Sequence, residues 1–460
     1  MILTSSELFI VGGTLINGDG HSTQSNATIH VVGDQIVDID TSGHRPRKDS
    51  TTSHVSLIDA AGGFVIPGVV NGHAHGCTTG PLFSSAALPL DAERVRQNAE
   101  RHLTDGVTTL INLCGLGSKE DLTVLDDHPL RTFISTTHFP EAIQAARIVD
   151  GAGLTAQHEA LSAEYMLATG QAVAIGEVGS GATLGGGVAS YKYVPQAVGE
   201  IFNKTINAAQ ATQLIDSLLG PNRQSPPSDE AFYESVMALE LVLSKPEQSK
   251  AVAKLKEAIV RYAQKPLVYS LKTFDSAAQL SAKTGDPAIF HTAMPSVAKL
   301  LEVAEDPKNQ DATLIAGHMN HTSIPLDQML IWAEKLKAAG VVIDVSILDS
   351  VHLQALVGTQ EIDALMASGL VDVLSTDYAA GNWDSILEAI ERWWQKGLIT
   401  LPRAVEMAAA APAALFPKAA HKRGRLMPGY FADIVITKKG DIGNVRTVII
   451  DGQVVRQATD

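Results

Sequence analysis

Short apolar runs alternate with helical segments through the middle of the chain, and most of these runs end near a polar residue. The first run, Phe64–Ile66 followed by Val69–Val70, leads into the sequence NGHAHG. The later runs are Val107–Leu113, Arg131–Thr136, Ala172–Val178, Pro287–Thr292, Ala312–His318, Val341–Ser346 and Val371–Asp377. Strands that alternate with helices predict a parallel α/β fold, and this number of strands closes into a (β/α)8 TIM-type barrel.

Both ends of the chain show a different pattern, in which short strand-like runs are separated by Gly, Asn and Asp turns. The pattern covers about Leu8–Asp40 and returns at Ala432–Thr437 and Val445–Val455. It predicts one small β-sandwich domain built from residues 1–64 together with 420–460, next to a barrel formed by residues 65–419.

A section inside the barrel region, about residues 195–266, is much longer than a barrel crossover requires. Its two amphipathic stretches, SPPSDEAFYESVMALELVLSK and QSKAVAKLKEAIVRYAQK, indicate helices. We therefore expect a helical insertion that serves as a lid or as an interface.

Composition limits the possible partners. A length of 460 residues fits one barrel with a smaller domain, and 45% hydrophobic residues indicate a large core. The net charge of −15 argues against nucleic acids and anionic membrane surfaces. The sequence shows neither a signal-like start nor a long apolar run, so we expect neither secretion by that route nor a membrane span. Cys77 and Cys114 are the only cysteines, so no disulfide framework is expected. We expect a cytoplasmic homo-oligomer that acts on a small molecule.

Polar side chains at the ends of the predicted strands indicate a metal site. His73 and His75 are two residues apart on an extended backbone, so their imidazoles point to the same face. Later strands end at Glu177, His291, His318 and Asp377. The carboxyl ends of barrel strands share one rim, and four imidazoles with two carboxylates suit a pair of divalent cations. Each residue alone could be structural, but burying the whole set without metal would be costly.

Several neighbouring residues leave alternatives open. His321 could replace His318 as the sixth-strand ligand, although His318 directly follows the strand and is preferred. His138, just after the third strand, could line the pocket or be a structural histidine. Cys77 is expected to be a packed small residue, because the site already has enough donors.

Taken together, six segments resemble the motifs of the amidohydrolase superfamily of metal-dependent barrel hydrolases. They are LIDAAGGFVIPGVVNGHAHG, AIGEVGSG, IFHT, GHMN, STD and GRLMPGYFADIVI, and they span nearly the whole chain outside the insertion. Many members of the superfamily carry a carbamylated lysine at the end of the fourth strand. Glu177 in GEVGSG is instead similar to the enamidase-like branch, in which a carboxylate bridges the metals. Lys192 and Lys272 are alternative bridges, but neither ends a convincing strand.

The resemblance implies a role for each ligand. His73, His75 and Asp377 would hold one metal, His291 and His318 the other, and Glu177 would bridge both together with a water or hydroxide. The metals are expected to be zinc, or zinc and iron. Asp377 would also accept the proton of the attacking water and pass it to the leaving nitrogen, so that Asp377 and Glu177 are the expected catalytic residues.

These roles predict a metal-dependent hydrolase that uses a metal-bridged hydroxide to cleave a non-peptide C–N bond, in a cyclic amide of enamide or lactam type. A heterocycle deaminase would use the same barrel, usually with a single metal and no bridging carboxylate. A lactonase also remains open, because the same hydroxide attacks esters. The alternative of another class is a scaffold that has kept the barrel but lost the metals.

Overall fold

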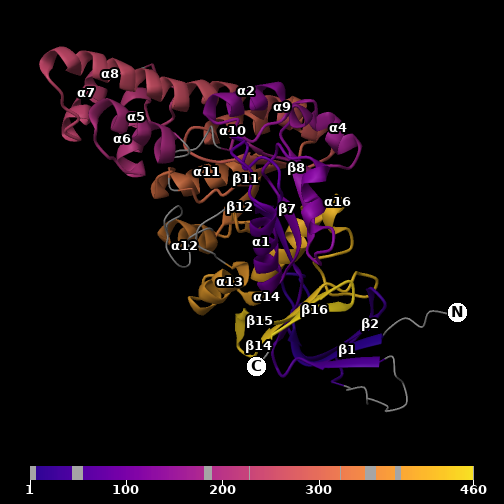
Figure 1. The fold of residues 1–460 in the computed structure, drawn as a ribbon. Coiled ribbons are helices and arrows are strands. Elements are labelled where there is room, and N and C mark those ends of the chain that lie inside the picture. Colours follow the sequence, from indigo (N-terminus) through magenta and orange to yellow (C-terminus); the bar gives the residue numbers. More distant parts are fainter. Residues whose placement is uncertain are drawn as a thin grey trace.

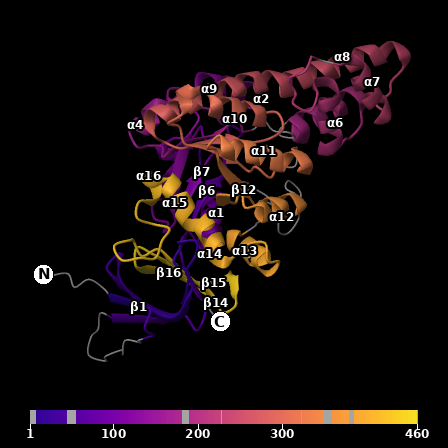
Figure 2. The same cartoon turned by 180° about the vertical axis from the view of Figure 1, so that it is seen from behind.

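The computed structural model describes residues 7–43, 55–180, 189–226, 228–321, 323–347, 359–378 and 385–458. Figure 1 shows a central barrel with helices around it, a small sheet at one end and a group of helices that projects from the other end. The view from behind in Figure 2 shows the same arrangement. Among the described residues, no helix is both long and apolar enough to cross a membrane.

The barrel consists of parallel strands in sequential order, as the sequence predicts. The strands are β6 (Val69–Ala74), β7 (Val107–Asn112), β8 (Arg131–Thr136), β9 (Ala174–Val178), β10 (Ala288–His291), β11 (Leu314–Gly317), β12 (Val342–Ser346) and β13 (Val373–Ser375). Just beyond the end of β13, the Asp377 N–H donates to the His73 carbonyl at 2.8 Å and the His75 N–H donates to the Tyr378 carbonyl at 2.7 Å. The first and last strands therefore meet at their carboxyl ends, which confirms the TIM-type barrel.

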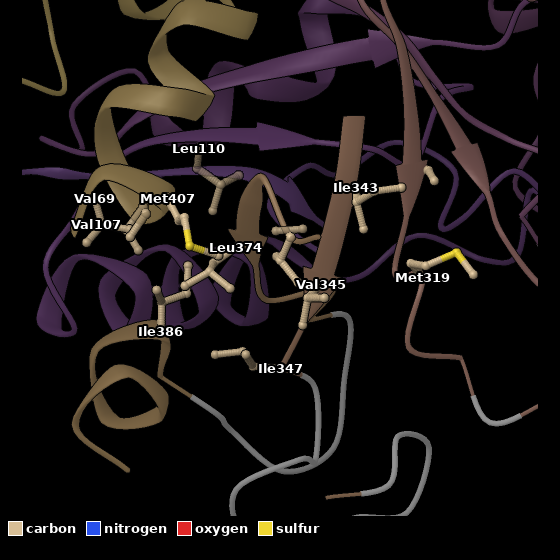
Figure 3. Packing of buried hydrophobic residues seen from close by; sticks show 14 of the residues in the cluster. Val69, Val107, Leu110, Met319, Ile343, Val345, Ile347, Leu374, Ile386 and Met407 are labelled. Atoms are coloured by element: carbon tan, nitrogen blue, oxygen red, sulfur yellow. The ribbon is translucent and has the colours of Figure 1, made fainter. Parts of the chain in front are cut away.

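The longer helices outside the barrel are α1 (Ala92–Thr104), α2 (Pro140–Val149), α9 (Lys265–Thr284), α10 (Val297–Glu305), α11 (Leu326–Ala338), α12 (Thr359–Ser368) and α13 (Ile386–Gln395). Shorter helices are α3 (Ala156–Glu159), α4 (Ala163–Ala168), α14 (Leu401–Val405), α15 (Ala411–Leu415) and α16 (Pro417–Ala420). Their apolar faces form the main core with the strands, and Figure 3 shows Leu374 of β13 beside Met407, which follows α14. Burial of these faces is the main stabilising contribution to the barrel.

Alternation along the strands decides which side chains enter the barrel. Ile289 packs with Ile111 and Ile315 in a separate cluster that Phe416 joins, whereas Phe290 contacts Phe274 of α9 at a ring distance of 4.8 Å. Because side chains two apart share a face, His291 points to the same side as Ile289, into the barrel.

A small sheet combines strands from both ends of the chain. It contains β1 (Glu7–Leu15), β2 (Gln24–Val32), β3 (Gln35–Asp40), β4 (Val55–Asp59), β5 (Phe64–Pro67), β14 (Ile434–Lys438), β15 (Asp441–Ile450) and β16 (Gln453–Gln457). β5 pairs with β14, and Ile10, Ile29 and Ile449 share one core. A separate sheet built from both ends of the chain is therefore present, where the sequence predicted a β-sandwich domain.

The first predicted apolar run is divided between the two parts of the fold. β5 belongs to the small sheet and β6 to the barrel, with only Gly68 between them. A Cβ atom at Gly68 would collide with the Thr108 side chain of β7. Glycine therefore allows the chain to pass directly from the small sheet into the first barrel strand.

The insertion forms helices α5 (Val194–Phe202), α6 (Ala208–Leu219), α7 (Asp229–Ala238) and α8 (Lys245–Ile259). They have a core of their own, which includes Val198, Leu214, Phe232 and Leu255. Figures 1 and 2 show this group projecting away from the barrel. One loop of the insertion returns to the barrel, where Gln224 Nε2 donates to the Pro295 carbonyl at 3.3 Å.

Candidate metal centre

The predicted ligands from different strands meet at the carboxyl end of the barrel. Their possible ligand atoms form two groups within which all atoms lie within 4.8 Å of one another. The groups are His73, His75, Glu177 and Asp377, and Glu177, His291 and His318. Because Glu177 belongs to both groups, the structure places one carboxylate between two candidate metal sites.

Glu177 lies near the end of β9, and the residue is 1% exposed. Its Oε1 atom lies 2.8 Å from His318 Nε2 and 4.0 Å from His291 Nε2, whereas its Oε2 atom lies 3.4 Å from His75 Nε2. Oε1 also lies 3.8 Å from His73 Nε2, so the carboxylate as a whole lies between the histidines of the two groups, where it could bridge two cations.

Asp377 faces the first pair of histidines. Its Oδ1 atom is 3.3 Å from His73 Nε2 and 3.2 Å from His75 Nε2, and its side chain is 23% exposed. Asp377, two residues after β13, and His318, directly after β11, have positive φ angles of 50° and 39°. This left-handed backbone is costly for such residues, so their positions depend on the surrounding contacts.

The carboxylates and imidazoles of the site compensate one another's charge, which allows these groups to be buried. Burial alone would raise the pKa of Asp377, but the charge of His73 and hydrogen bonds from His73 and His75 lower it far below its ordinary range. Burial and the neighbouring His318 hold the pKa of His291 well below its usual value. Although burial alone would lower them, the neighbouring carboxylates raise the pKa values of His73, His75 and His318, so a cation that bound these imidazoles would displace their protons.

The donor atoms fit divalent cations that prefer nitrogen and carboxylate oxygen. His73 gives a specific indication of this fit. Its Nδ1 atom faces the Asp344 carboxylate at 3.3 Å, so the proton lies on that nitrogen. Its other nitrogen, Nε2, is buried and faces Asp377 Oδ1 at 3.3 Å, without a hydrogen bond of normal geometry among the described residues. Because Asp344 holds the Nδ1 proton, Nε2 is the nitrogen that would bind a metal once its own proton is displaced.

Asp344 of β12 is a functional residue that the sequence analysis missed. Its Oδ2 atom accepts from His73 Nδ1 at 3.3 Å, from the His318 N–H at 3.2 Å and from Ser375 Oγ at 2.9 Å. One carboxylate thus orients a ligand from each group. An acidic residue inside the apolar run VVIDVS was the signal available in the sequence, because such a charge is buried only when it has partners.

We expect Asp344→Asn to lower zinc affinity by about 10- to 100-fold, the usual cost of losing a partner that orients a metal-binding histidine. The substitution preserves shape but replaces the charged acceptor of three hydrogen bonds. Competition with a chromogenic chelator measures the change. The matched control is Asp372→Asn, because Asp372 pairs with Lys337 at 2.7 Å at the amino end of β13. Equal zinc affinities of both variants would contradict the role of Asp344.

The alternative bridging lysines lie elsewhere. Lys192 Nζ is 3.6 Å from Asp150 and its side chain is 56% exposed. Lys272 lies over the ring of Tyr269 at 5.9 Å from its centroid. Glu177, in contrast, belongs to both groups of possible ligands.

The other candidates surround the centre without entering either group. The His321 ring lies beside His318, and burial lowers the pKa of His321 to about 3. His138 is buried against Thr136, with Nδ1 3.0 Å from Oγ1. Burial raises the pKa of the Cys77 thiol, consistent with a packed small residue. The sequence analysis gave no role to Cys114, whose Sγ atom lies 3.7 Å from His75 Nδ1.

Comparison with known proteins agrees with this architecture. Residues 286–455 match the model of the amidohydrolase family. No curated protein matched the sequence.

Several solved structures share the fold over nearly the whole chain. A β-aspartyl dipeptidase from Fervidobacterium islandicum AW-1 has a TM-score of 0.56 and 15% identity, over 98% of this chain and 97% of that one. A prolidase complexed with N-methylphosphonate-L-proline has a TM-score of 0.56 and 12% identity, over 98% and 100% of the two chains. A D-aminoacylase described as having a binuclear metal centre has a TM-score of 0.55 and 14% identity, over 98% and 96%.

Proposed function

We propose that this protein is a metal-dependent hydrolase that cleaves a non-peptide C–N bond, with a cyclic amide of lactam or enamide type as its substrate. The observation that carries the proposal is the shared carboxylate, because the oxygens of Glu177 face His75 on one side and His318 on the other. The amidohydrolase-family match over residues 286–455 supports the reaction type. The preference for a ring rests on the similarity of GEVGSG to the enamidase-like branch.

The ligand set would hold two divalent cations, with zinc as the first candidate and iron as the second. His73, His75 and Asp377 would bind one of them, His291 and His318 the other, and Glu177 both. Bound in this way, such cations lower the pKa of a water held between them and polarise the carbonyl under attack.

The proton transfer would then fall to Asp377. Its carboxylate is partly exposed, at 23%, and lies close to both histidines of the first group. An ionised carboxylate in this position can accept a proton from the attacking water and deliver it to the leaving nitrogen. The delivery matters because an unprotonated amide nitrogen is a poor leaving group.

The competing functions differ in metal content and product. A deaminase would carry one metal and release ammonia from a heterocycle, but a shared carboxylate has no task at a single metal. A scaffold would bind no metal, yet the six candidate ligands lie together in one buried centre. A lactonase would use the same ligands on an ester and can be separated only by its substrate.

The test is elemental analysis of protein purified without chelator or added metal, followed by assays on hydantoin, a six-membered lactam, an N-acyl amino acid and a lactone. We expect close to two metals per chain and ring opening of a cyclic amide. One metal with ammonia release would favour the deaminase, and no metal would favour the scaffold. Hydrolysis of the linear amide or the lactone alone would overturn the cyclic-amide proposal.

A further inference from the structure

A histidine outside both ligand groups lies next to the metal centre. The ring centroid of His321 is 5.6 Å from that of His291 and 5.6 Å from that of His318. His321 is half-buried, whereas the histidines beside it are fully buried. It therefore lies within reach of a small molecule bound at the second ligand group.

The tautomer of His321 is fixed by its surroundings. The Ser323 N–H donates to His321 Nδ1 at 3.1 Å, and a backbone N–H can only donate. Ser323 Oγ, 2.9 Å from the same nitrogen, accepts from the Met294 N–H at 3.0 Å, which leaves its own hydroxyl proton for Nδ1. Since Nδ1 must accept, the ring proton lies on Nε2, at the edge of the ring away from Ser323.

The loop that carries His321 is held at several points. The His321 N–H donates to the His318 carbonyl at 2.9 Å. The side chain of Asn320 exchanges hydrogen bonds of 2.8 and 3.1 Å with the backbone of Ser346 on β12. The Ser323 hydroxyl connects the same loop to Met294, after β10. A donor that is held in this way requires little reorganisation when charge develops beside it.

We propose that His321 is a catalytic residue whose Nε2–H donates a hydrogen bond to the carbonyl oxygen of the scissile amide as negative charge develops there. This inference rests on the proposed function. The fixed proton on Nε2, the position beside His291 and His318 and the partial exposure together support it. The second ligand group would thus have a protein donor in addition to its metal.

The experiment compares zinc-loaded wild type with His321→Ala and His321→Asn, the latter retaining an N–H donor. The probe is methylphosphonate, a tetrahedral anion that mimics the attacked carbonyl, and its binding is measured by calorimetry. We expect His321→Ala to bind the probe about 10- to 100-fold more weakly, the usual effect of losing a hydrogen bond to a charged group. His321→Asn should recover part of this loss, and both variants should keep the zinc content of the wild type.

The matched control is His158→Gln. In His158 the Nδ1 atom also accepts a backbone N–H, that of Thr155 at 3.3 Å, but its Nε2 atom faces Asp121 at 3.1 Å, and His158 is in neither ligand group. This variant should bind the probe as the wild type does. With a hydrolysed substrate, His321→Ala should lower kcat by about 100- to 1,000-fold and change KM little, the pattern of a lost oxyanion donor.

A structural readout tests the tautomer without activity. Protein with ¹⁵N-labelled histidine should show His321, identified by its absence in His321→Ala, with the proton on Nε2. A proton on Nδ1, or unchanged probe affinity in His321→Ala at normal zinc content, would overturn the inference. Loss of zinc from His321→Ala would make His321 a ligand instead. Absence of zinc from the wild type would overturn the proposed function, and this inference with it.

Discussion

Glu177→Ala is expected to remove both metals from the protein and thereby to lower its activity more than about 100-fold. Loss of a residue that only orients a ligand already costs up to about 100-fold, so loss of a shared ligand should exceed it. The physical reason is that Glu177 Oε1 lies 2.8 Å from His318 Nε2 while Oε2 lies 3.4 Å from His75 Nε2. The substitution also leaves the buried histidines with less compensating negative charge.

Elemental analysis of Glu177→Ala measures this effect directly. Glu164→Ala is the control, because Glu164 is 62% exposed and pairs with Lys283 at the surface. The control should keep the metal content of the wild type. If Glu177→Ala kept one metal per chain, Glu177 would belong to a single site, and if it kept both, Glu177 would not be a ligand.

Asp377→Asn is expected to lower kcat by about 100- to 10,000-fold, the contribution of general acid–base catalysis. The asparagine oxygen can still face His73 and His75, at present 3.3 and 3.2 Å away, but the neutral amide cannot accept the proton of the attacking water. The loss should therefore persist at saturating zinc. Steady-state kinetics with increasing zinc measures both quantities in one experiment.

A change of leaving group separates the two tasks of Asp377. A p-nitrophenyl ester releases a leaving group that needs no proton, so Asp377→Asn should lose less activity on the ester than on the amide. Asp363→Asn is a suitable control, because Asp363 pairs with Lys396 on the outer helices at 2.5 Å. If added zinc restored the full activity of Asp377→Asn, Asp377 would be a ligand without a role in proton transfer.

The strand ends illustrate what local pattern could predict. Each apolar run that precedes a polar residue was recognisable in the sequence, and the barrel brings all carboxyl ends of its strands to one rim. The position of His75, two residues after His73, follows from alternation alone. The division of the first run into β5 and β6 did not follow, because it depends on the contact between Gly68 and Thr108 of the next strand.

By itself, the sequence determined the order of the barrel strands, the small sheet built from both ends, and the set of residues that could bind metal, because burial periodicity and strand-end chemistry are local properties. Only the tertiary structure decided that Glu177 faces both groups, that Asp344 orients His73 and His318, and that the Ser323 N–H fixes the tautomer of His321. The reason is physical. These relations are hydrogen-bond distances between atoms on different strands and loops, and they are set by how the strands pack and turn rather than by any local pattern.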